Sequence, residues 1–454
     1  MGGRRKDIRR LGFDRNLKAE FHGAEAGGAG MISLIMRFGL LLFVCGVHGV
    51  GAFGSESANL ELSVEQVTFG PKHHFFGYIG QSKTIPWDAG GRYILALRVG
   101  YHDHMPEPGD AAEVVLIDTE QADRVVQVDR SLAWNFQQGT MFYWNPDSAG
   151  RQFFFNDRDP NTQEVFTVLY DVERRCRIRE YRFKDVPVAN GGVCPRGGFF
   201  LAINYGRMAR LRPVTGYPGT ADPTAKVAAP ANDGIFRVDV ATGQRRLLVS
   251  FEQLRDLLRD KHPRIKEVSF YINHSLCSRS GGLVYFYARA RLGDSPMAVN
   301  APCSVRTDGT GLTAHEYTGG HPEWAEGSRV IGRKGERQVI YDVERREIVG
   351  QIATPEVIEK PGGDISLSPD GKWFVNGYGS GGKNYYVIVR LSDGAHVRSQ
   401  GFSRGPYTRG ELRIDPAPCW NRTSDAILVP GYTEGGTRQM FIIRVRQNAS
   451  GGNK

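Results

Sequence analysis

The sequence predicts an all-β protein, a seven-bladed β-propeller. Seven times the chain places a turn rich in Gly, Asp, Asn or Ser before a strand of β-branched and aromatic residues, and a second strand follows each time. The copies recur at spacings of about 45 to 85 residues, which is typical of propeller blades. A pair of β-sandwiches would not explain seven copies of one pattern. The turn-and-strand segments begin at Trp87, Trp144, Cys194, Cys277, Ala325, Ser368 and Trp420.

The composition fits a folded domain with a mild basic excess. The 454 residues are 40% hydrophobic and 11% aromatic, which is enough for a large core. The formal net charge is +9, and residues 1–54 hold eight Lys/Arg against four Asp/Glu, so that +5 belongs to the remainder. Basic and acidic residues alternate after residue 20, which argues against nucleic acid as a partner. A mild positive bias suits an anionic polysaccharide.

Residues 1–54 are predicted to be a leader and signal peptide, and residues 60–448 the propeller. Arg37 precedes an apolar run, Phe38 to Val50, and Ala52-Phe53-Gly54 resembles a cleavage site. The protein is therefore expected to be secreted or periplasmic. Either translation starts at Met31 or Met36, or the basic region before the run is unusually long. No later segment has the roughly 20 apolar residues needed to span a bilayer.

Cysteines offer one alternative and one constraint. Cys45 lies within the apolar run, and it would make the protein lipid-anchored if it belonged to a lipoprotein signal, although Phe43 and Val44 fit that pattern poorly. Five cysteines follow the signal, namely Cys176, Cys194, Cys277, Cys303 and Cys419. An odd number without CxxC spacing argues against a disulfide framework or a zinc ribbon, so that at least one buried free thiol is expected.

Two insertions are expected beside the third blade. Ser250 to His262 carries apolar residues at helical spacing behind a possible serine N-cap, and predicts a helix. Pro213 to Asn232 is rich in Pro, Ala and Gly and predicts a loop. Irregular chain at the edge of a rigid scaffold often shapes a substrate site.

The strand before each repeated turn is expected to line the central channel, and these strands are unusually polar. Buried polar groups need water, one another, a metal or a ligand as partners. His274, His321 and Asp364 come from consecutive blades and could hold a divalent cation such as zinc, manganese or calcium. The alternative is that such side chains bond only to water and backbone. In "GGHPEW", Trp324 is expected to pack between blades and Pro322 to end the ladder, which leaves His321 for a site.

A second polar segment, "NYGRMARLRP", is predicted to lie at a strand end that leads into the long loop. It combines Tyr205 with Arg207, Arg210 and Arg212. Arginine binds carboxylate or sulfate through two hydrogen bonds, and a tyrosine beside a cation can transfer protons. The alternative is an exposed cationic strand edge. GxSxG, HExxH, Walker and dinucleotide motifs are absent, so a peptidase propeller and an organic cofactor are not expected.

The segments "HHFFGY", "WNFQQG", "FFFNDRD", "NYGRMARLRP", "FYINH" and "GGHPEW" resemble secreted bacterial propellers related to ulvan lyases and, more distantly, oligogalacturonate lyases. The resemblance spans residues 73–445 and implies β-elimination on a uronate-containing polysaccharide or oligosaccharide. It implies Tyr205 as acid/base and a neighbouring arginine as the charge-neutralising group. Where relatives carry a histidine near "WNxQ", this chain has Phe136, Gln137 and Gln138.

The resemblance completes the expected site and also leaves a competing class open. The candidate catalytic residues are Tyr205, Arg207, Arg210 and Gln138. The candidate saccharide-binding residues are His73, His74, Asn135, Arg212, Asn273, Glu323 and Arg413. The metal pattern of the relatives is incomplete, because "GGDIS" and "DPAPC" replace two of its strands; Asp364 could substitute for one ligand and Ala417 could not for the other. The missing histidine near Gln138 favours the alternative, a non-catalytic TolB-like propeller that binds carbohydrate or protein.

Overall fold

The computed structural model describes residues 59–78, 84–121, 124–263, 265, 268–292, 295–316 and 319–447, with only the backbone at 291–298. The chain divides into two compact units, residues 1–51 and 52–454, and every described residue belongs to the second. The predicted signal peptide therefore lies outside the described residues. Within the described part of the chain, no helix is long and apolar enough to cross a membrane.

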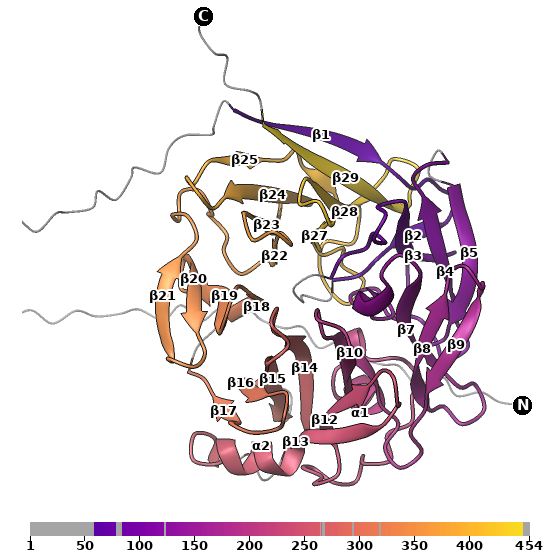
Figure 1. Cartoon of the computed structure of the whole chain (residues 1–454), viewed down its shortest axis with the longest axis vertical. Coiled ribbons are helices and arrows are strands. Elements are labelled where there is room, and N and C mark those ends of the chain that lie inside the picture. The colour runs from indigo at the N-terminus through magenta and orange to yellow at the C-terminus, as the bar shows by residue number, and fades with distance from the viewer. Residues whose placement is uncertain are drawn as a thin grey trace, which may run out of the picture. The chain divides into compact units, whose positions relative to one another are not determined.

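Seven antiparallel sheets form a ring around a central channel, and the predicted seven-bladed propeller is confirmed (Figure 1). The strands of blades 1 to 3 are β2 (His73–Phe75), β3 (Tyr93–Val99), β4 (Ala112–Asp118), β5 (Arg124–Ser131); β6 (Tyr143–Trp144), β7 (Gln152–Arg158), β8 (Val165–Asp171), β9 (Cys176–Tyr181); and β10 (Ala189–Val193), β11 (Phe199–Ile203), β12 (Gly234–Asp239), β13 (Arg245–Ser250).

Blades 4 to 6 continue the same order from the channel outwards. Their strands are β14 (Phe270–Cys277), β15 (Leu283–Leu292), β16 (Ser295–Arg306), β17 (Thr313–Ala314); β18 (Gly319–Trp324), β19 (Arg329–Lys334), β20 (Arg337–Asp342), β21 (Glu347–Gln351); and β22 (Asp364–Leu367), β23 (Trp373–Ser380), β24 (Lys383–Arg390), β25 (His396–Arg398), with β26 (Phe402–Ser403) also pairing to β24.

Blade 7 is built from both ends of the described chain. It consists of β27 (Cys419–Trp420), β28 (Ala426–Tyr432), β29 (Arg438–Gln447) and, outermost, β1 (Leu60–Gln66). The pairing of β1 with β29 runs from Leu60 opposite Gln447 to Gln66 opposite Phe441, and the two strands lie side by side in Figure 1. The first described strand therefore closes the ring.

The two insertions lie in and after blade 3. Helix α2 (Phe251–Leu258) begins at Ser250, whose side chain accepts from the backbone of Gln253 in a capping box, so the predicted helix is confirmed. The predicted loop after Pro213 is also confirmed, apart from the short 3-10 turn η2 (Pro213–Thr215). Another such turn, η1 (Pro146–Ser148), follows β6.

The segment with Tyr205 follows the end of β11 and leads into the long loop, as predicted, but it forms helix α1 (Tyr205–Leu211), which was not predicted. The side chain of Asn204 accepts from the backbone N–H of Arg207 and so caps the helix. The residues that follow are mostly good helix formers and include no β-branched side chain. The four positively charged or phenolic candidates thus belong to one short helix and the turn after it.

Tryptophans tie neighbouring blades together at one recurring position, the last residue of an innermost strand. The indole N–H of Trp144 donates to the carbonyl of Pro86 in blade 1 at 2.8 Å. Trp324 donates to Leu276 of blade 4 at 2.8 Å, and Trp420 donates to Ser366 of blade 6 at 3.1 Å. The predicted packing of Trp324 between blades is therefore confirmed.

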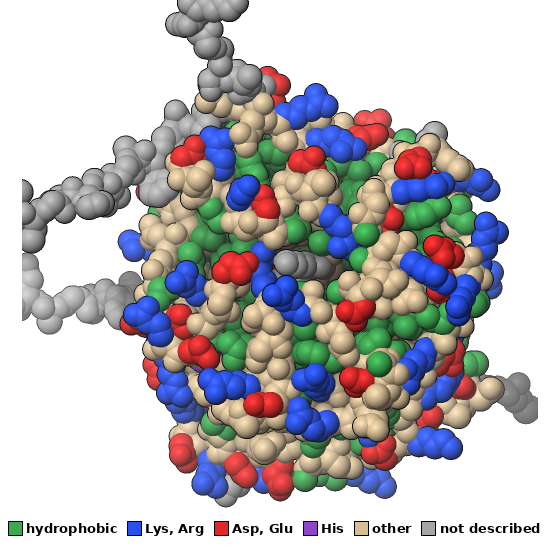
Figure 2. All heavy atoms as spheres, in the orientation of Figure 1, with side chains coloured by type: hydrophobic (Ala, Val, Ile, Leu, Met, Phe, Trp, Pro, Cys, Tyr) green, Lys and Arg blue, Asp and Glu red, His purple; other side chains and the backbone are tan. Residues whose placement is uncertain are grey.

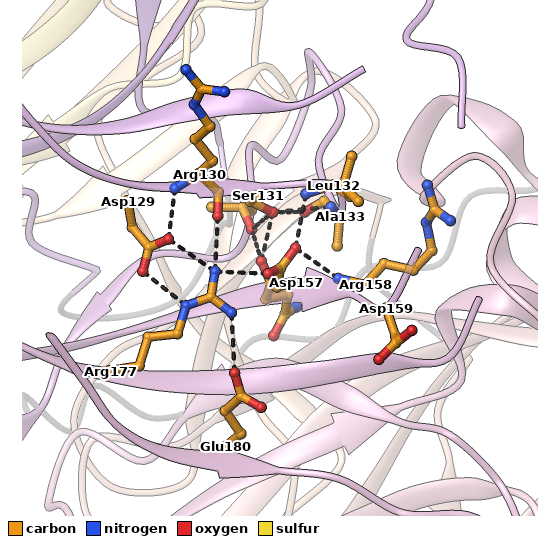
Figure 3. A network of polar contacts seen from close by, with 12 residues as sticks. Asp129, Arg130, Ser131, Leu132, Ala133, Asp157, Arg158, Asp159, Arg177 and Glu180 are labelled. Carbon is orange, nitrogen blue, oxygen red and sulfur yellow. Dashed lines mark hydrogen bonds and ion pairs between the residues drawn. The ribbon is translucent and has the colours of Figure 1, made fainter. Parts of the chain in front are cut away.

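Blades 1 and 2 are also joined by a polar network around Arg177 of β9 (Figure 3). The guanidinium donates twice to Asp129 of β5 at 2.9 Å and lies 2.8 Å from a carboxylate oxygen of Asp157 on β7. Asp157 in turn accepts from the backbone N–H groups of Leu132 and Arg158, and burial raises the pKa of its carboxyl. Arg177 thus neutralises a carboxylate that could not easily be solvated.

Replacing Arg177 by alanine is expected to destabilise the propeller by about 2 kcal/mol, because Asp157 keeps its burial and loses its cation. Urea denaturation of the purified protein at pH 7 measures the loss. Arg174→Ala, which removes an exposed arginine of the same hairpin, is the matched control. Equal unfolding midpoints for the two variants would show that the network adds no stability.

Candidate functional site

The innermost strands of blades 3, 4 and 5 share an irregularity on the channel side. Each pairing with the next strand shifts register, between Asn190 and Gly192 in β10, between Asn273 and Leu276 in β14, and between Gly319 and Glu323 in β18. Such bulges redirect side chains and are common beside functional sites. The bulge of β14 contains His274 at a φ of 56°, a left-handed conformation that is unfavourable for a non-glycine residue. The bulge of β18 contains His321.

The glycines of "GGHPEW" allow two blades to approach closely. Gly320 has a φ of +77°, and a Cβ atom there would lie 2.8 Å from the Cα atom of Gly362 in the segment leading to β22. Gly362 has a φ of +91° and is equally restricted. Pro322 does not end the ladder as predicted, because pairing resumes at Glu323 opposite Ile331. The proline lies within the bulge, where no ladder hydrogen bond is required of it.

His321 and Asp364 form a pair between blades 5 and 6. The Nδ1 atom of His321 lies 2.7 Å from an Oδ1 atom of Asp364. The other oxygen of Asp364 accepts from the backbone N–H of Ala417 at 2.9 Å. The carboxylate side chain is almost fully buried, whereas 34% of the histidine side chain is exposed. The two groups are in contact but are not aligned for a hydrogen bond. A ligand can reach this imidazole beside a carboxylate, an arrangement suited to proton transfer.

A pocket of about 310 Å³ opens beside this pair. It carries three cationic side chains, Lys360, Arg404 and Arg413, and one further carboxylate, Asp415. Burial first, and then the charge of Asp364, raises the pKa of the Asp415 carboxyl. Its remaining lining residues are His321, Pro361, Gly362, Gly363, Asp364, Tyr378, Gly379 and Pro416. Three cations and two carboxylates thus line the pocket, and basic and acidic side chains are also interspersed over the face of the molecule shown in Figure 2. The excess of positive charge in the pocket fits an anionic ligand.

The segment from Arg404 to Asp415, here called the strap, brings two of these arginines to the pocket. Arg404 donates through Nε to the carbonyl of Ile414 at 3.0 Å, and Arg413 donates to Asp415 at 2.8 Å. The side-chain amide of Gln137 holds the strap from the blade 1 side by donating to the carbonyls of Glu411 and Arg413. These hydrogen bonds from the Nε atoms hold the guanidinium groups of Arg404 and Arg413 at the pocket.

Glu323 lies deeper, two residues after His321 on β18. One carboxyl oxygen accepts from the backbone N–H of Leu367 at 2.7 Å, and the other lies 3.9 Å from the guanidinium of Arg279. Burial raises the pKa of Glu323 to about 8. The nearby phenol of Tyr78 donates to the carbonyl of Ile365, and its ring contacts that of His321 at 5.2 Å between centroids. The predicted saccharide-binding role of Glu323 stays a prediction, because its side chain is buried and does not line the pocket.

The three predicted metal ligands lie near one another in the structure. The rings of His274 and His321 are 5.3 Å apart between centroids, and Asp364 contacts His321 directly. However, no group of three or more His, Cys, Asp or Glu among the described residues is arranged to hold a metal ion. The Nδ1 atom of His321 lies 2.7 Å from an oxygen of Asp364, and the predicted metal site stays a prediction.

The candidates on and after α1 are placed away from this pocket. The side chain of Tyr205 is 1% exposed, its hydroxyl donates to the carbonyl of Asn190 at 3.1 Å, and its ring stacks on Tyr217. Arg207 is buried and donates to the carbonyls of Phe270, Val227 and Ala228, among others. Arg210 pairs with Asp222 at 3.0 Å, and Arg212 forms the end of the helix. Helix α1 thus anchors the long loop to blades 3 and 4.

Tyr205→Phe is expected to cost about 1 kcal/mol of stability, since one buried hydrogen bond is lost, and to leave any saccharide cleavage within about threefold of wild type. Thermal unfolding and a cleavage assay on the same preparation measure the two effects. A phenylalanine variant of normal stability that had lost cleavage would instead support the predicted catalytic role of Tyr205.

The remaining predicted residues join the blades or shape turns. Asn135 accepts from the backbone N–H groups of Gln137 and Gln138, and so forms the turn that contains both glutamines. His73 accepts from the backbone N–H of Arg438, and His74 bonds to the Gln439 side chain at 3.0 Å. Asn273 accepts from the backbone of His274. Burial lowers the pKa of His74 to about 4, so that it is neutral at pH 7.

Sequence reasoning found His321, Asp364 and Arg413 but missed Lys360, Arg404 and Asn204. Lys360 and Arg404 lie in connections, whereas the residues predicted to line the channel come from the innermost strands. The available signals were the segment "KPGGD" directly before an innermost strand and the arginine-rich, glycine-rich segment "SRGPYTRGELR". Asn204 in front of "YGRMARL" was a readable helix start.

Comparison with known proteins supports the fold. No family model matches the chain, and no curated protein sequence matches it. The chain is similar in structure to an oligogalacturonate lyase in complex with manganese, with a TM-score of 0.55 and 12% identity over 86% of this chain and 95% of that one. The β-propeller domain of Cps50 (Swd1) from Myceliophteria thermophila has a TM-score of 0.44 and 14% identity over 81% of this chain and 96% of that one. TolB from Acinetobacter baumannii has a TM-score of 0.38 and 12% identity over 86% of this chain and 98% of that one. At these identities the likeness concerns the propeller architecture alone.

Proposed function

We propose that the protein binds a uronate-containing acidic saccharide in the pocket beside His321 and cleaves it by β-elimination. The observation that carries the proposal is the partly exposed imidazole of His321, 2.7 Å from the Asp364 carboxylate, at the edge of a pocket with three cations. Lyase chemistry needs both parts, a base for the proton at C5 of the uronate and positive charge beside its carboxylate.

The residues of the pocket divide the reaction between them. Lys360, Arg404 and Arg413 lower the cost of the negative charge that develops on the uronate carboxylate as the C5–H bond breaks. His321 accepts that proton while Asp364 stabilises the resulting imidazolium. The electron pair forms the C4=C5 double bond, the C4–O4 bond breaks, and the imidazolium returns the proton to the leaving oxygen. The products are a 4,5-unsaturated uronate end and a free hydroxyl end.

The test separates binding from cleavage. The purified protein is incubated with ulvan, polygalacturonate and glycosaminoglycans, and the ultraviolet absorbance of unsaturated uronate is followed. Calorimetry measures the binding of the same polymers. Rising absorbance with at least one polymer is expected. Failure of all of them to react, together with failure to bind, would overturn the proposal.

A non-catalytic saccharide-binding propeller is the second candidate. It is favoured by the ion pair of Arg413 with Asp415, which partly neutralises the pocket. Less positive charge then remains to stabilise the negative charge that develops during β-elimination. This function predicts salt-sensitive binding of an acidic polymer without any rise in absorbance. Export of the protein, with or without a lipid anchor at Cys45, stays a prediction in either case.

A further inference from the structure

The cysteines of blades 3 and 4 meet in the core. Cys194 directly follows β10, and Cys277 is the last residue of β14. The two innermost strands are in contact, since the hydroxyl of Ser275 donates to the carbonyl of Gly191 at 2.8 Å. Both cysteines are buried, and a Cβ atom at Gly281, in the turn that follows Cys277, would lie 3.0 Å from the sulfur of Cys194, which therefore faces blade 4. Each thiol also shifts the pKa of the other.

The position of Cys277 in its blade has a specific structural role. It is the position that Trp144, Trp324 and Trp420 occupy in blades 2, 5 and 7, directly before the residue whose N–H closes the following turn. Each of those tryptophans bonds to the preceding blade. In blade 4 the side chain at this position again faces the preceding blade, but it is a thiol and its partner is another thiol.

We infer that Cys194 and Cys277 form a disulfide bond between blades 3 and 4 when the protein folds under oxidising conditions. The bond would take the place of the tryptophan tie at this junction. It would also close a covalent loop that contains both insertions, the segment with α1 and the long loop, and the segment with α2. Covalent closure of a long loop restricts the unfolded chain and so stabilises the folded one.

The chemistry is an ordinary thiol–disulfide exchange. The hydrogen bond from the Cys277 thiol lowers the pKa of the Cys194 thiol, which favours Cys194 as the attacking thiolate. It displaces one half of a small disulfide oxidant such as glutathione disulfide, and Cys277 then displaces the other half. One S–S bond forms between the blades, and the two protons and two electrons leave with two molecules of glutathione thiol.

Two other buried cysteines lack such a partner and serve as controls. The thiol of Cys303 donates to the carbonyl of Ala301 at 3.6 Å, and that of Cys419 donates to Ala417 at 3.8 Å. Both acceptors lie two residues earlier in the same segment of chain. Cys303 lies in blade 4 and is as deeply buried as Cys277, so Cys303→Ser is the matched control for Cys277→Ser.

The full chain is refolded from urea in glutathione buffers that are mostly oxidised or mostly reduced, then denatured without reductant, alkylated and digested. After oxidising refolding, mass spectrometry is expected to find the peptides of Cys194 and Cys277 joined, and a melting temperature several degrees above that of the reduced protein. Cys303→Ser is expected to keep this difference, and Cys194→Ser or Cys277→Ser to abolish it. Alkylation of both cysteines in the oxidised wild type would overturn the inference, and this measurement needs no variant to fold.

Discussion

Replacing His321 by asparagine is expected to lower kcat for β-elimination by 10²- to 10⁴-fold and to change saccharide affinity by less than about threefold. The loss has this size because a positioned general base contributes about that factor, and asparagine keeps a polar side chain of similar reach without a titrating nitrogen. The three pocket cations remain in place and continue to bind the anionic polymer. Initial rates of unsaturated-uronate formation and calorimetric titrations measure the two quantities.

The specificity of this result is checked at a second histidine and at the partner of the first. His396→Asn changes a histidine on the outer strand β25 and is expected to leave kcat unchanged. Asp364→Asn retains the size of the carboxylate but not its charge, and is expected to lower kcat at least tenfold. If His321→Asn retained the wild-type kcat, His321 would not be the base. Equal loss of saccharide binding in His321→Asn and Asp364→Asn would indicate that the pocket had collapsed.

Replacing Glu323 by glutamine is expected to make the stability of the propeller less dependent on pH. The folded-state pKa of Glu323 is about 8, against an ordinary value of 4.5. Between these two values the unfolded chain has lost the proton that the folded protein retains. The free energy of unfolding should therefore fall as pH rises from about 4.5 to 8, by up to about 1.4 kcal/mol per pH unit. The contribution of Glu323 to stability should be greatest below about pH 4.5.

Glutamine cannot ionise, and its amide oxygen can still accept from the backbone of Leu367. Glu323→Gln should thus match the wild type near pH 5 and exceed its stability by a few kcal/mol at pH 8. Urea unfolding midpoints at pH 5, 6.5 and 8 make the comparison, with Glu336→Gln, a change at an exposed glutamate of the same blade, as the control. Parallel pH profiles for wild type and Glu323→Gln would contradict the prediction.

The propeller was predictable because its signal is local and repeated. Every blade places a turn and a strand of alternating character in the same order, and seven copies exceed what chance or another fold would give. Consecutive blades of a propeller are neighbours in the ring, so His274, His321 and Asp364, which come from consecutive blades, could be grouped from the sequence alone. Their actual contacts, the approach of His321 to Asp364 and the neighbouring rings of His274 and His321, depend on the bulge of β18 and on side-chain rotamers.

The segment around Tyr205 shows the opposite case. Its residue types suit catalysis, but the cap at Asn204 converts the segment to helix and turns the phenol against Tyr217 in the core. Lys360 and Arg404 were not predicted, because the residues of a connection do not alternate between two faces, and the sequence therefore does not show toward which side their side chains point. The meeting of Cys194 and Cys277 was equally hidden, since a count of cysteines carries no information about which innermost strands are neighbours.

The pairing of β1 with β29 has a consequence for the order in which the molecule assembles. Strand β1 precedes the other described strands in the chain, yet its partner β29 is the last of them to be synthesised. Until β29 is made, β1 is an unpaired strand with the apolar side chains Leu60, Leu62 and Val64. Unpaired apolar strands tend to pair with other chains and so to aggregate. The contact that joins the ends of the ring has the greatest sequence separation of any in the propeller, and contacts of that kind form slowly. Completion of blade 7 should therefore be the latest step of folding, and the one most in need of protection by a chaperone.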